Sequence, residues 1–365
     1  MKTKVAVAMS GGVDSSVTAL LLKKAGHEVI GITLKIWQCK PEEISYKTKL
    51  CCSEKDVEDA KNVCSKIGIP HYTFDFYNEF EKYVIDPFCE SYMKGLTPNP
   101  CILCNRHIKF DLLYKKIKTL GFDYLATGHY ARIEKKGATY YLKKGKDTKN
   151  EQSYWLYVLD QNILEHVLMP LGNRTKTEVR TIAKNSGLPV ADKPKSQEIC
   201  FITEKNYRSF IQKNIKKSHQ LKKGPIVDTK NNVLGYHSGI FNFTIGQREG
   251  LGLSLGKRMY VKKIIPEKNT IVVDEEENIY SKEIFVGETN WINKDENLKF
   301  PLRARVRIRY KHKEELAFIY PFGKKFYRIV FDKPQWAPTP GQSAVIYKGD
   351  IVLGGGIIQK NDCNN

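Results

Sequence analysis

A short loop near the N-terminus has residue types that bind phosphate. The segment Ser10-Gly11-Gly12-Val13-Asp14-Ser15-Ser16 lies between an apolar run at residues 4–9 and a helical pattern that follows. A helix start presents free backbone N–H groups to an anion, and glycines let a phosphate approach the chain closely. The GxxxxGK[ST] pattern is absent, so this is not a Walker loop. The bland alternative is an ordinary Gly-Gly turn before a helix cap.

Thiol chemistry is the second possibility that the residues raise. The chain has nine cysteines, an odd number, and its first residues enter a strand-like pattern with no room for a secretory signal. We therefore expect a cytoplasmic protein without a disulfide framework. Two segments place cysteines beside turn or strand-end signals, TPNPCILCNRHIKF (97–110) and KSQEICFI (195–202). The cysteines without such surroundings are expected to be structural or incidental: Cys39, Cys64, Cys89 and Cys363.

The charge of the chain points to a polyanionic partner. The 365 residues carry a formal net charge of +20, and residues 211–365 alone have 27 Lys+Arg against 16 Asp+Glu. Neutralising phosphates releases counterions, so nucleic acid is the leading partner class, with a merely lysine-rich surface as the alternative. No run of about 18 apolar residues exists that could span a bilayer, so no membrane partner is expected.

The elements that must position these residues change character along the chain. Apolar runs at 4–9, 27–34, near Asp75 and at 123–131 alternate with helical segments, which predicts a parallel sheet covered by helices. After about residue 210 short, Gly-punctuated, alternating segments predict strands. We expect an α/β domain at 1–210, a small β-rich domain at 211–277 and a β-barrel at 278–365, because this length exceeds one ordinary domain.

The phosphate loop resembles the SGGxDS loop of the ATP pyrophosphatase (PP-loop) group. Members of that group split ATP between the α and β phosphates and adenylylate a carbonyl oxygen, and their Asp helps to hold the metal bound to pyrophosphate. The resemblance implies ATP and Mg²⁺ as cofactors and an α/β domain of the adenine-nucleotide α-hydrolase type. A nucleophile must then replace the activated oxygen.

The cysteine segments identify that nucleophile through a second resemblance. Together with the loop, CCS at 51–53 and ATGHYAR at 126–132, they are similar to the tRNA-specific 2-thiouridylase family along essentially the whole chain. That family thiolates C2 of the wobble uridine in certain tRNAs. The resemblance implies that Cys200 carries a persulfide, that Cys104 attacks it, and that a transient Cys104–Cys200 disulfide forms. It also implies a sulfur-donor protein, either a cysteine desulfurase or a sulfur-relay carrier.

The same resemblance implies which residues touch each substrate. Those expected at ATP are Ala8, Met9, Ser10, Gly11, Gly12, Val13, Asp14, Ser15, Leu34 and Gly128. Those expected at tRNA or its target base are Asn99, Pro100, Cys101, His129, Asn150, Glu151, Gln152, Arg309, Tyr310 and Gln342. Independently of the family, LRARVRIRYKHK (302–313) alternates strictly, which predicts a strand with a row of arginines at 303, 305, 307 and 309 suited to phosphates. A solvated outer face of a barrel strand is the alternative.

Cys101 departs from part of the family. Some members have Asp at this position, which is thought to assist the nearby cysteine. Here Cys101, Cys104 and Cys200 supply three soft ligands, which leaves an iron–sulfur cluster as a minor possibility, although one CxxC is a weak metal signal. Two rival functions stay open: a PP-loop enzyme that adds an amine to RNA or a nucleotide, and a non-enzymatic RNA-binding protein with a cysteine-bound metal.

Overall fold

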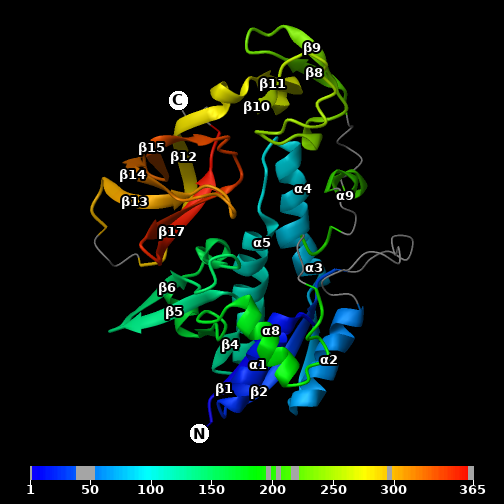
Figure 1. Ribbon diagram of the computed structural model, residues 1–365, viewed down its shortest axis with the longest axis vertical. Coiled ribbons are helices and arrows are strands. Elements are labelled where there is room, and N and C mark those ends of the chain that lie inside the picture. The colour runs from blue at the N-terminus through cyan, green and yellow to red at the C-terminus, as the bar shows by residue number, and fades with distance from the viewer. Residues whose placement is uncertain are drawn as a thin grey trace.

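The computed structural model describes residues 2–37, 54–194, 199–202, 207–214, 222–293 and 298–360. At its base lies a five-stranded sheet in which every neighbouring pair is parallel (Figure 1). The strand order is β3 (His71–Asp75), β2 (Glu28–Lys35), β1 (Lys4–Ala8), β4 (Tyr124–Ala126) and β7 (Val167–Leu168). Parallel strands end at one common edge, so residues that follow β1, β2 and β4 meet there.

Helices cover both faces of this sheet. Along β1 the side chains alternate, with Val5 and Val7 in one apolar cluster and Ala6 in another. The first cluster lies under α1 (Val13–Lys24), α2 (Glu54–Ile67) and α8 (Lys176–Asn185). The second lies under η3 (Cys104–Leu113), a π-helix, and α6 (Tyr114–Thr119). The result is a three-layer domain.

A helical stem connects this domain to the β domains (Figure 1). It contains α3 (Tyr77–Phe80), the π-helix η2 (Glu81–Ile85), α4 (Asp86–Met93) and α5 (Pro100–Leu103), which leads directly into η3. The helix α9 (Tyr207–Asn214) contributes Phe210 and Ile211 to the same apolar cluster as α4. The α/β domain also contains the 3-10 helix η4 (Ser153–Leu156) and the short helix α7 (Gln161–Glu165).

Two β units follow. The central sheet has the order β10 (Tyr260–Ile265), β11 (Thr270–Asp274), β8 (Gly224–Val227) and β9 (Val233–His237). The last unit has six strands: β12 (Tyr280–Trp291), β13 (Leu302–Arg307), β14 (Glu315–Phe322), β15 (Phe326–Trp336), β16 (Ser343–Lys348) and β17 (Ile351–Ile358). Because β12 pairs with both β15 and β17, this sheet closes into a barrel. The predicted α/β domain followed by β domains that end in a barrel is confirmed.

A hairpin of the α/β domain docks on this barrel. Strands β5 (Ala131–Lys136) and β6 (Thr139–Lys144) extend the barrel sheet through the pair Lys143 and Ile351. Arg132 and Lys143 both form ion pairs with Asp350. The domain boundaries after residues 210 and 277 stay predictions, and residue 210 lies inside α9. None of the helices in the described ranges is long and apolar enough to cross a bilayer.

Candidate active site

The phosphate loop lies at the carboxyl edge of the sheet, between β1 and α1. Gly12 is the N-cap of α1 in an extended conformation, and no side chain caps the helix start. Ser16 Oγ donates to the Gly12 carbonyl at 2.8 Å, and the Ser10 N–H donates to Ser15 Oγ at 3.2 Å. These hydroxyls hold the loop, while the N–H groups of the first helical turn remain available to an anion.

Two glycines allow other backbone segments to approach the loop. Gly11 has φ +64°, and a Cβ there would lie 2.3 Å from the Asp56 carbonyl oxygen. A Cβ at Gly128 would lie 2.9 Å from the Asp14 carbonyl carbon. The turn after β4 therefore touches the start of α1 directly. This contact brings Gly128 beside the loop, as the resemblance implies.

The other residues expected at ATP gather at the same edge. Ala8 ends β1, and the Met9 N–H donates to the Ile32 carbonyl of β2 at 2.7 Å. Leu34 lies near the end of β2 and is partly buried. Since β1, β2 and β4 are parallel neighbours, the structure brings together the residues at 8–15, Leu34 and Gly128. Their contact with ATP stays a prediction.

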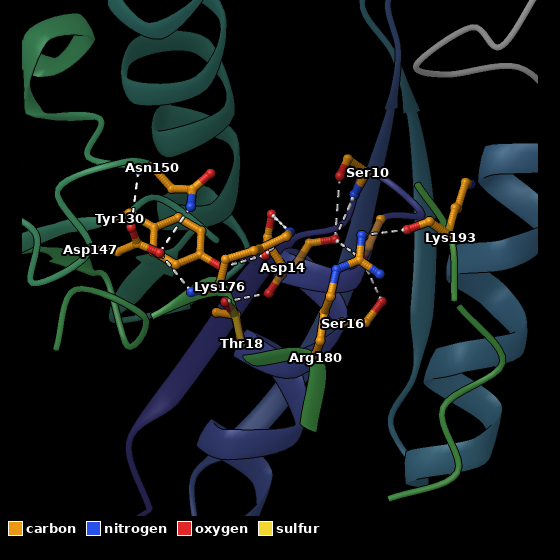
Figure 2. A network of polar contacts seen from close by, with 12 residues as sticks. Ser10, Asp14, Ser16, Thr18, Tyr130, Asp147, Asn150, Lys176, Arg180 and Lys193 are labelled. Carbon is orange, nitrogen blue, oxygen red and sulfur yellow. Dashed lines mark hydrogen bonds and ion pairs between the residues drawn. The ribbon is translucent and has the colours of Figure 1, made fainter. Parts of the chain in front are cut away.

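Charged side chains surround the loop (Figure 2). Lys176 Nζ lies 2.6 and 2.7 Å from the two carboxylate oxygens of Asp14, and the Tyr130 hydroxyl donates to Asp14 Oδ1 at 2.7 Å. Lys193 Nζ donates to the Gly11 carbonyl at 2.9 Å and pairs with Asp56 and Asp59 at 2.6 Å each. Burial and the Asp14 carboxylate both raise the pKa of Tyr130, so its hydroxyl remains a proton donor.

Arg180 completes this cationic surround from helix α8. Its guanidinium donates to the backbone carbonyls of Ala191 and Lys193 at 3.2 and 3.0 Å. It thereby fixes the segment that carries Lys193 toward the loop. Three cations within one small region are suited to a triphosphate, because each offsets part of its negative charge.

The two proposed catalytic cysteines belong to one apolar cluster. Cys104 is a buried member at the start of η3, and Cys200 is partly buried against the same cluster. Phe201 is 1% exposed and packs edge-on against Phe80 and Phe88, which anchors the residue next to Cys200. Leu34 of β2 also packs against this cluster, so the carboxyl edge of the sheet adjoins the cluster that contains the cysteines.

Cys104 differs from the buried Cys64 and Cys89 in having a nearby cation that acts on its pKa. Burial raises the pKa of Cys104, while the charge of Lys109 lowers it. Burial raises the pKa of Cys64 and of Cys89 to about 12, so both stay protonated and inert, as expected. None of the five described cysteines is in a disulfide, and Cys39, Cys51, Cys52 and Cys363 lie outside the described residues.

Cys101 is half-buried on α5, whose N-cap is Asn99 and whose first residue is Pro100. The barrel holds the chain just before this helix: the Thr97 N–H donates to the Pro340 carbonyl, and Gln342 Nε2 donates to the Thr97 carbonyl, both at 2.9 Å. A cavity of about 720 Å³ opens beside Asn99 between all three domains. It also borders Arg106, Glu267, Glu288 and Lys360.

Comparison with known proteins identifies the family. Three family models match successive parts of the chain: a tRNA methyl transferase HUP domain at residues 3–204, a tRNA methyl transferase PRC-barrel domain at 208–275 and an aminomethyltransferase β-barrel domain at 281–358. The tRNA-specific 2-thiouridylase of Acetivibrio thermocellus is 51% identical over 98% of this chain and 99% of its own length. That of Clostridioides difficile is 50% identical over 99% of both chains. This chain belongs to the tRNA-specific 2-thiouridylase family.

The residues at 150–152, expected at tRNA in this 2-thiouridylase family, are engaged within the protein here. Asn150 closes a turn on Asp147, to which its side chain donates at 2.9 Å. Glu151 is 6% exposed, and its carboxylate binds Arg307 of the barrel at 3.0 Å. Gln152 Oε1 accepts from the Tyr130 N–H at 2.9 Å. Two of the three therefore help to join other elements in this conformation.

His129 is buried beside the phosphate loop. Its Nδ1 and the Thr127 hydroxyl are 2.8 Å apart, and its ring centroid lies 5.9 Å from that of Phe110. Burial first, and then the charge of Lys109, hold the pKa of His129 well below its ordinary value. The imidazole is therefore neutral at physiological pH, which suits a hydrogen bond to an uncharged base better than one to phosphate.

The arginine strand is confirmed as a strand but not as a free cationic row. Ala304, Val306 and Ile308 are buried, as the alternation predicts. Arg303, however, is paired with Asp332, and Arg307 bridges Glu151 and Glu314. Asp332 of β15, Glu314 and Glu151 supply carboxylates that the local pattern does not reveal, and the binding of phosphates by this row stays a prediction.

The two family positions that follow the strand are also held by the protein. Arg309 lies over the Trp336 ring at 5.2 Å and donates to the Ala337 carbonyl and to Thr339. Tyr310 stacks on Trp155 with ring centroids 4.0 Å apart. Arg309 thus binds within the barrel unit, whereas Tyr310 joins the barrel to Trp155 of the α/β domain. The contact of both with tRNA stays a prediction.

Sequence reasoning missed the partners of the phosphate loop: Tyr130, Lys176, Arg180 and Lys193. The signal for Lys176 was present, since the capping box Thr175-x-x-Glu178 fixes it as the first residue of α8. Nothing local indicates that this helix starts beside residue 14, because the two lie 162 positions apart. Lys109, whose charge lowers the pKa of both Cys104 and His129, belongs to the cysteine segment 97–110.

Proposed function

We propose that this chain catalyses the ATP-dependent 2-thiolation of the wobble uridine in tRNAs of the Lys, Glu and Gln type. One observation carries the proposal: Leu34, at the carboxyl edge of the sheet where the phosphate loop lies, packs against the cluster that contains Cys104 and Cys200. ATP activation and sulfur delivery both need access to one base atom, so their sites must adjoin. The 2-thiouridylase relatives, matched over nearly their whole length, support the same assignment.

The first step activates the base. The C2 oxygen of uridine attacks the α phosphate of ATP, and pyrophosphate leaves with the pair of electrons of the broken P–O bond. The first turn of α1 and Lys176 would bind the phosphates, while the charges of Arg180 and Lys193, which keep their own partners, would help to offset that of the departing pyrophosphate. Nε2 of the neutral His129, whose Nδ1 is bonded to the Thr127 hydroxyl, would hydrogen-bond the base.

The second step delivers sulfur. Cys200 carries a persulfide, Cys200–S–SH, and the Cys104 thiolate attacks the Cys200 sulfur, which forms a Cys104–Cys200 disulfide and releases hydrosulfide. Hydrosulfide attacks C2, and AMP leaves with the former carbonyl oxygen. Two electrons from an external thiol reductant then reopen the disulfide. A persulfide-carrying protein must recharge Cys200.

The residues at the loop fit Mg²⁺ and do not gather a cluster site. Mg²⁺ bound with a nucleotide needs one or two carboxylates besides phosphate oxygens, and Asp14 supplies one at the loop. Among the described residues, no three His, Cys, Asp or Glu side chains form a group that could hold a metal ion, so Cys101, Cys104 and Cys200 do not do so in this conformation. The described cysteines therefore do not fit an iron–sulfur cluster in this conformation.

Mass analysis of the wobble uridine tests the proposal. Cognate tRNA is incubated with Mg-ATP, a persulfide source and wild type, Cys200→Ala or the control Cys64→Ala, whose thiol lies in the cluster under α2. We expect 2-thiouridine with wild type and the control, and none with Cys200→Ala. Thiolation that persists in Cys200→Ala would refute the role of this cysteine.

The same assay separates the rival functions. Formation of AMP and pyrophosphate with an amine-modified base, undiminished in Cys200→Ser, would favour an amine-transferring PP-loop enzyme. Binding of tRNA with neither product would favour a non-enzymatic RNA-binding protein. A methylated uridine would instead match the descriptions that two of the family models have.

A further inference from the structure

Lys176 occupies an unusual position for a lysine. It is the first residue of α8, and its backbone N–H donates to Asp147 Oδ2 at 2.7 Å. A positive charge at a helix N-terminus is unfavourable, because the free N–H groups there already carry positive partial charge. Helix stability therefore does not explain a lysine here. Its side chain is only 15% exposed and reaches past the ring of Tyr130 to Asp14 (Figure 2).

The Asp14–Lys176 pair is built at the mouth of the anion site. Both carboxylate oxygens of Asp14 accept from Lys176, within the first turn of α1. A metal ion that arrives with the nucleotide would compete with Lys176 for these same oxygens. The phosphates that accompany the metal offer the ammonium new acceptors of the same charge. Lys176 can thus exchange a carboxylate for a phosphate without becoming an unpaired, partly buried cation.

Lys193 and Arg180 lack this freedom. Lys193 has three partners, namely the Gly11 carbonyl and the carboxylates of Asp56 and Asp59, and no single exchange would release it. Arg180 binds two carbonyls of the segment that carries Lys193. These two cations hold the loop in shape, whereas the ion pairs of Lys176 within the described residues involve Asp14 alone, which is itself expected to bind the metal.

We propose that Lys176 is a phosphate-binding residue of this site, kept in place by Asp14 until the metal-bound β and γ phosphates of ATP take both partners. This inference rests on the proposed ATP-dependent function and adds to it a residue 162 positions from the loop. It assigns Asp14 two successive partners, first Lys176 and then the metal. Tyr130 stays on Asp14 throughout as a neutral donor.

Calorimetric titration of ATP, inorganic pyrophosphate and AMP in the presence of Mg²⁺ tests this proposal. Lys176→Met is expected to weaken the binding of ATP and pyrophosphate roughly 10- to 100-fold, the effect of a lost charged hydrogen bond. AMP binding should change less than about twofold, because AMP lacks the β and γ phosphates. Lys176→Arg should recover most of the loss. The control is Lys184→Met on the same helix, whose exposed ammonium pairs with Asp192.

A second variant pair guards against a folding defect in Lys176→Met. Without Mg²⁺, Asp14→Asn should bind pyrophosphate more tightly than wild type, since Lys176 has lost its competing carboxylate. The double variant Asp14→Asn/Lys176→Met should lose that gain. Equal losses for ATP and AMP, no loss for either, or a gain that survives in the double variant would each overturn the proposal. A wild-type chain that binds no ATP would instead overturn the proposed function.

Discussion

At the carboxyl edge of the parallel sheet, Asp14, Asp56 and Asp59 each have a lysine partner, whereas the adjoining cluster with Cys104 and Cys200 is built from aromatic and aliphatic side chains. The first region is prepared for a ligand with several negative charges. The second buries the Cys104 thiol and half-buries that of Cys200, and burial favours the neutral form of a thiol. Activation of the base and protection of the sulfur thus have separate environments that meet at Leu34.

The largest effect is expected in the apolar region. Phe201→Ala removes a ring that is 1% exposed and packed on Phe80 and Phe88, which should lower the free energy of unfolding by about 3–5 kcal/mol. Because Phe201 adjoins Cys200, thiolation should fall more than the folded fraction does. Denaturant unfolding and the thiolation assay measure the two effects. The control Phe318→Ala on the barrel, 38% exposed, should cost much less.

If Phe201→Ala lost stability without a further loss of thiolation per folded molecule, the cluster would be a simple core. Sulfur transfer would then not depend on how firmly the cluster anchors Cys200. That outcome would leave the charged edge as the region that limits the reaction.

In the charged region, a single added methyl group at Gly11 is expected to destabilise the fold. Gly11→Ala adds a Cβ 2.3 Å from the Asp56 carbonyl oxygen at φ +64°, which should cost about 2–4 kcal/mol in unfolding free energy. Gly26→Ala is the matched control, since Gly26 also has positive φ but has open space around it. It should cost only about 1–2 kcal/mol. Equal costs for the two variants would show that the loop can move away from α2.

The two regions differ in how far sequence alone could predict them. The phosphate loop and the cysteine segments are local signals, since strand, turn, helix start and thiols follow within a few residues. The ion pairs are not local: Glu151 and Arg307 are 156 positions apart, and Asp14 and Lys176 are 162 apart. Alternation at 302–309 predicted which side chains face outward, but not that Glu151 of another domain would cover Arg307.

The charge of Lys109 acts on the pKa of Cys104, so removing this charge should shift the pH dependence of the thiolation rate. Burial raises the pKa of Cys104 and the charge of Lys109 offsets part of that rise; the Lys109 ammonium donates to Asn105 Oδ1 at 3.1 Å. In Lys109→Met the pKa of Cys104 should rise. Since the thiolate is the attacking form, the rising limb of thiolation rate against pH should move to higher pH, with Lys109→Arg near wild type.

Thiolate absorbance in the ultraviolet gives a direct check on that shift, with Cys104→Ser as the reference that removes the signal. An unchanged titration of Cys104 in Lys109→Met would mean that another group activates this cysteine. The half-buried Cys101 on α5, where the resemblance implies Asp in some members, would then be the next candidate.

The smallest effect concerns the contact that joins the cysteine helices to the barrel. Gln342→Ala removes one neutral hydrogen bond, 2.9 Å long, to the Thr97 carbonyl, which should cost about 1 kcal/mol of stability. The resemblance places Gln342 at tRNA, so a purely structural role and a binding role predict different results. Gln359→Ala is the control, because Gln359 borders the cavity beside Asn99 and its side-chain amide donates to the carbonyl of Ile357. If Gln342 also contacts tRNA, the dissociation constant measured by filter binding should rise about 5-fold or more beyond the control. Equal affinities of the two variants would confine Gln342 to holding residues 96–99 against the barrel, beside the bond from the Thr97 N–H to the Pro340 carbonyl.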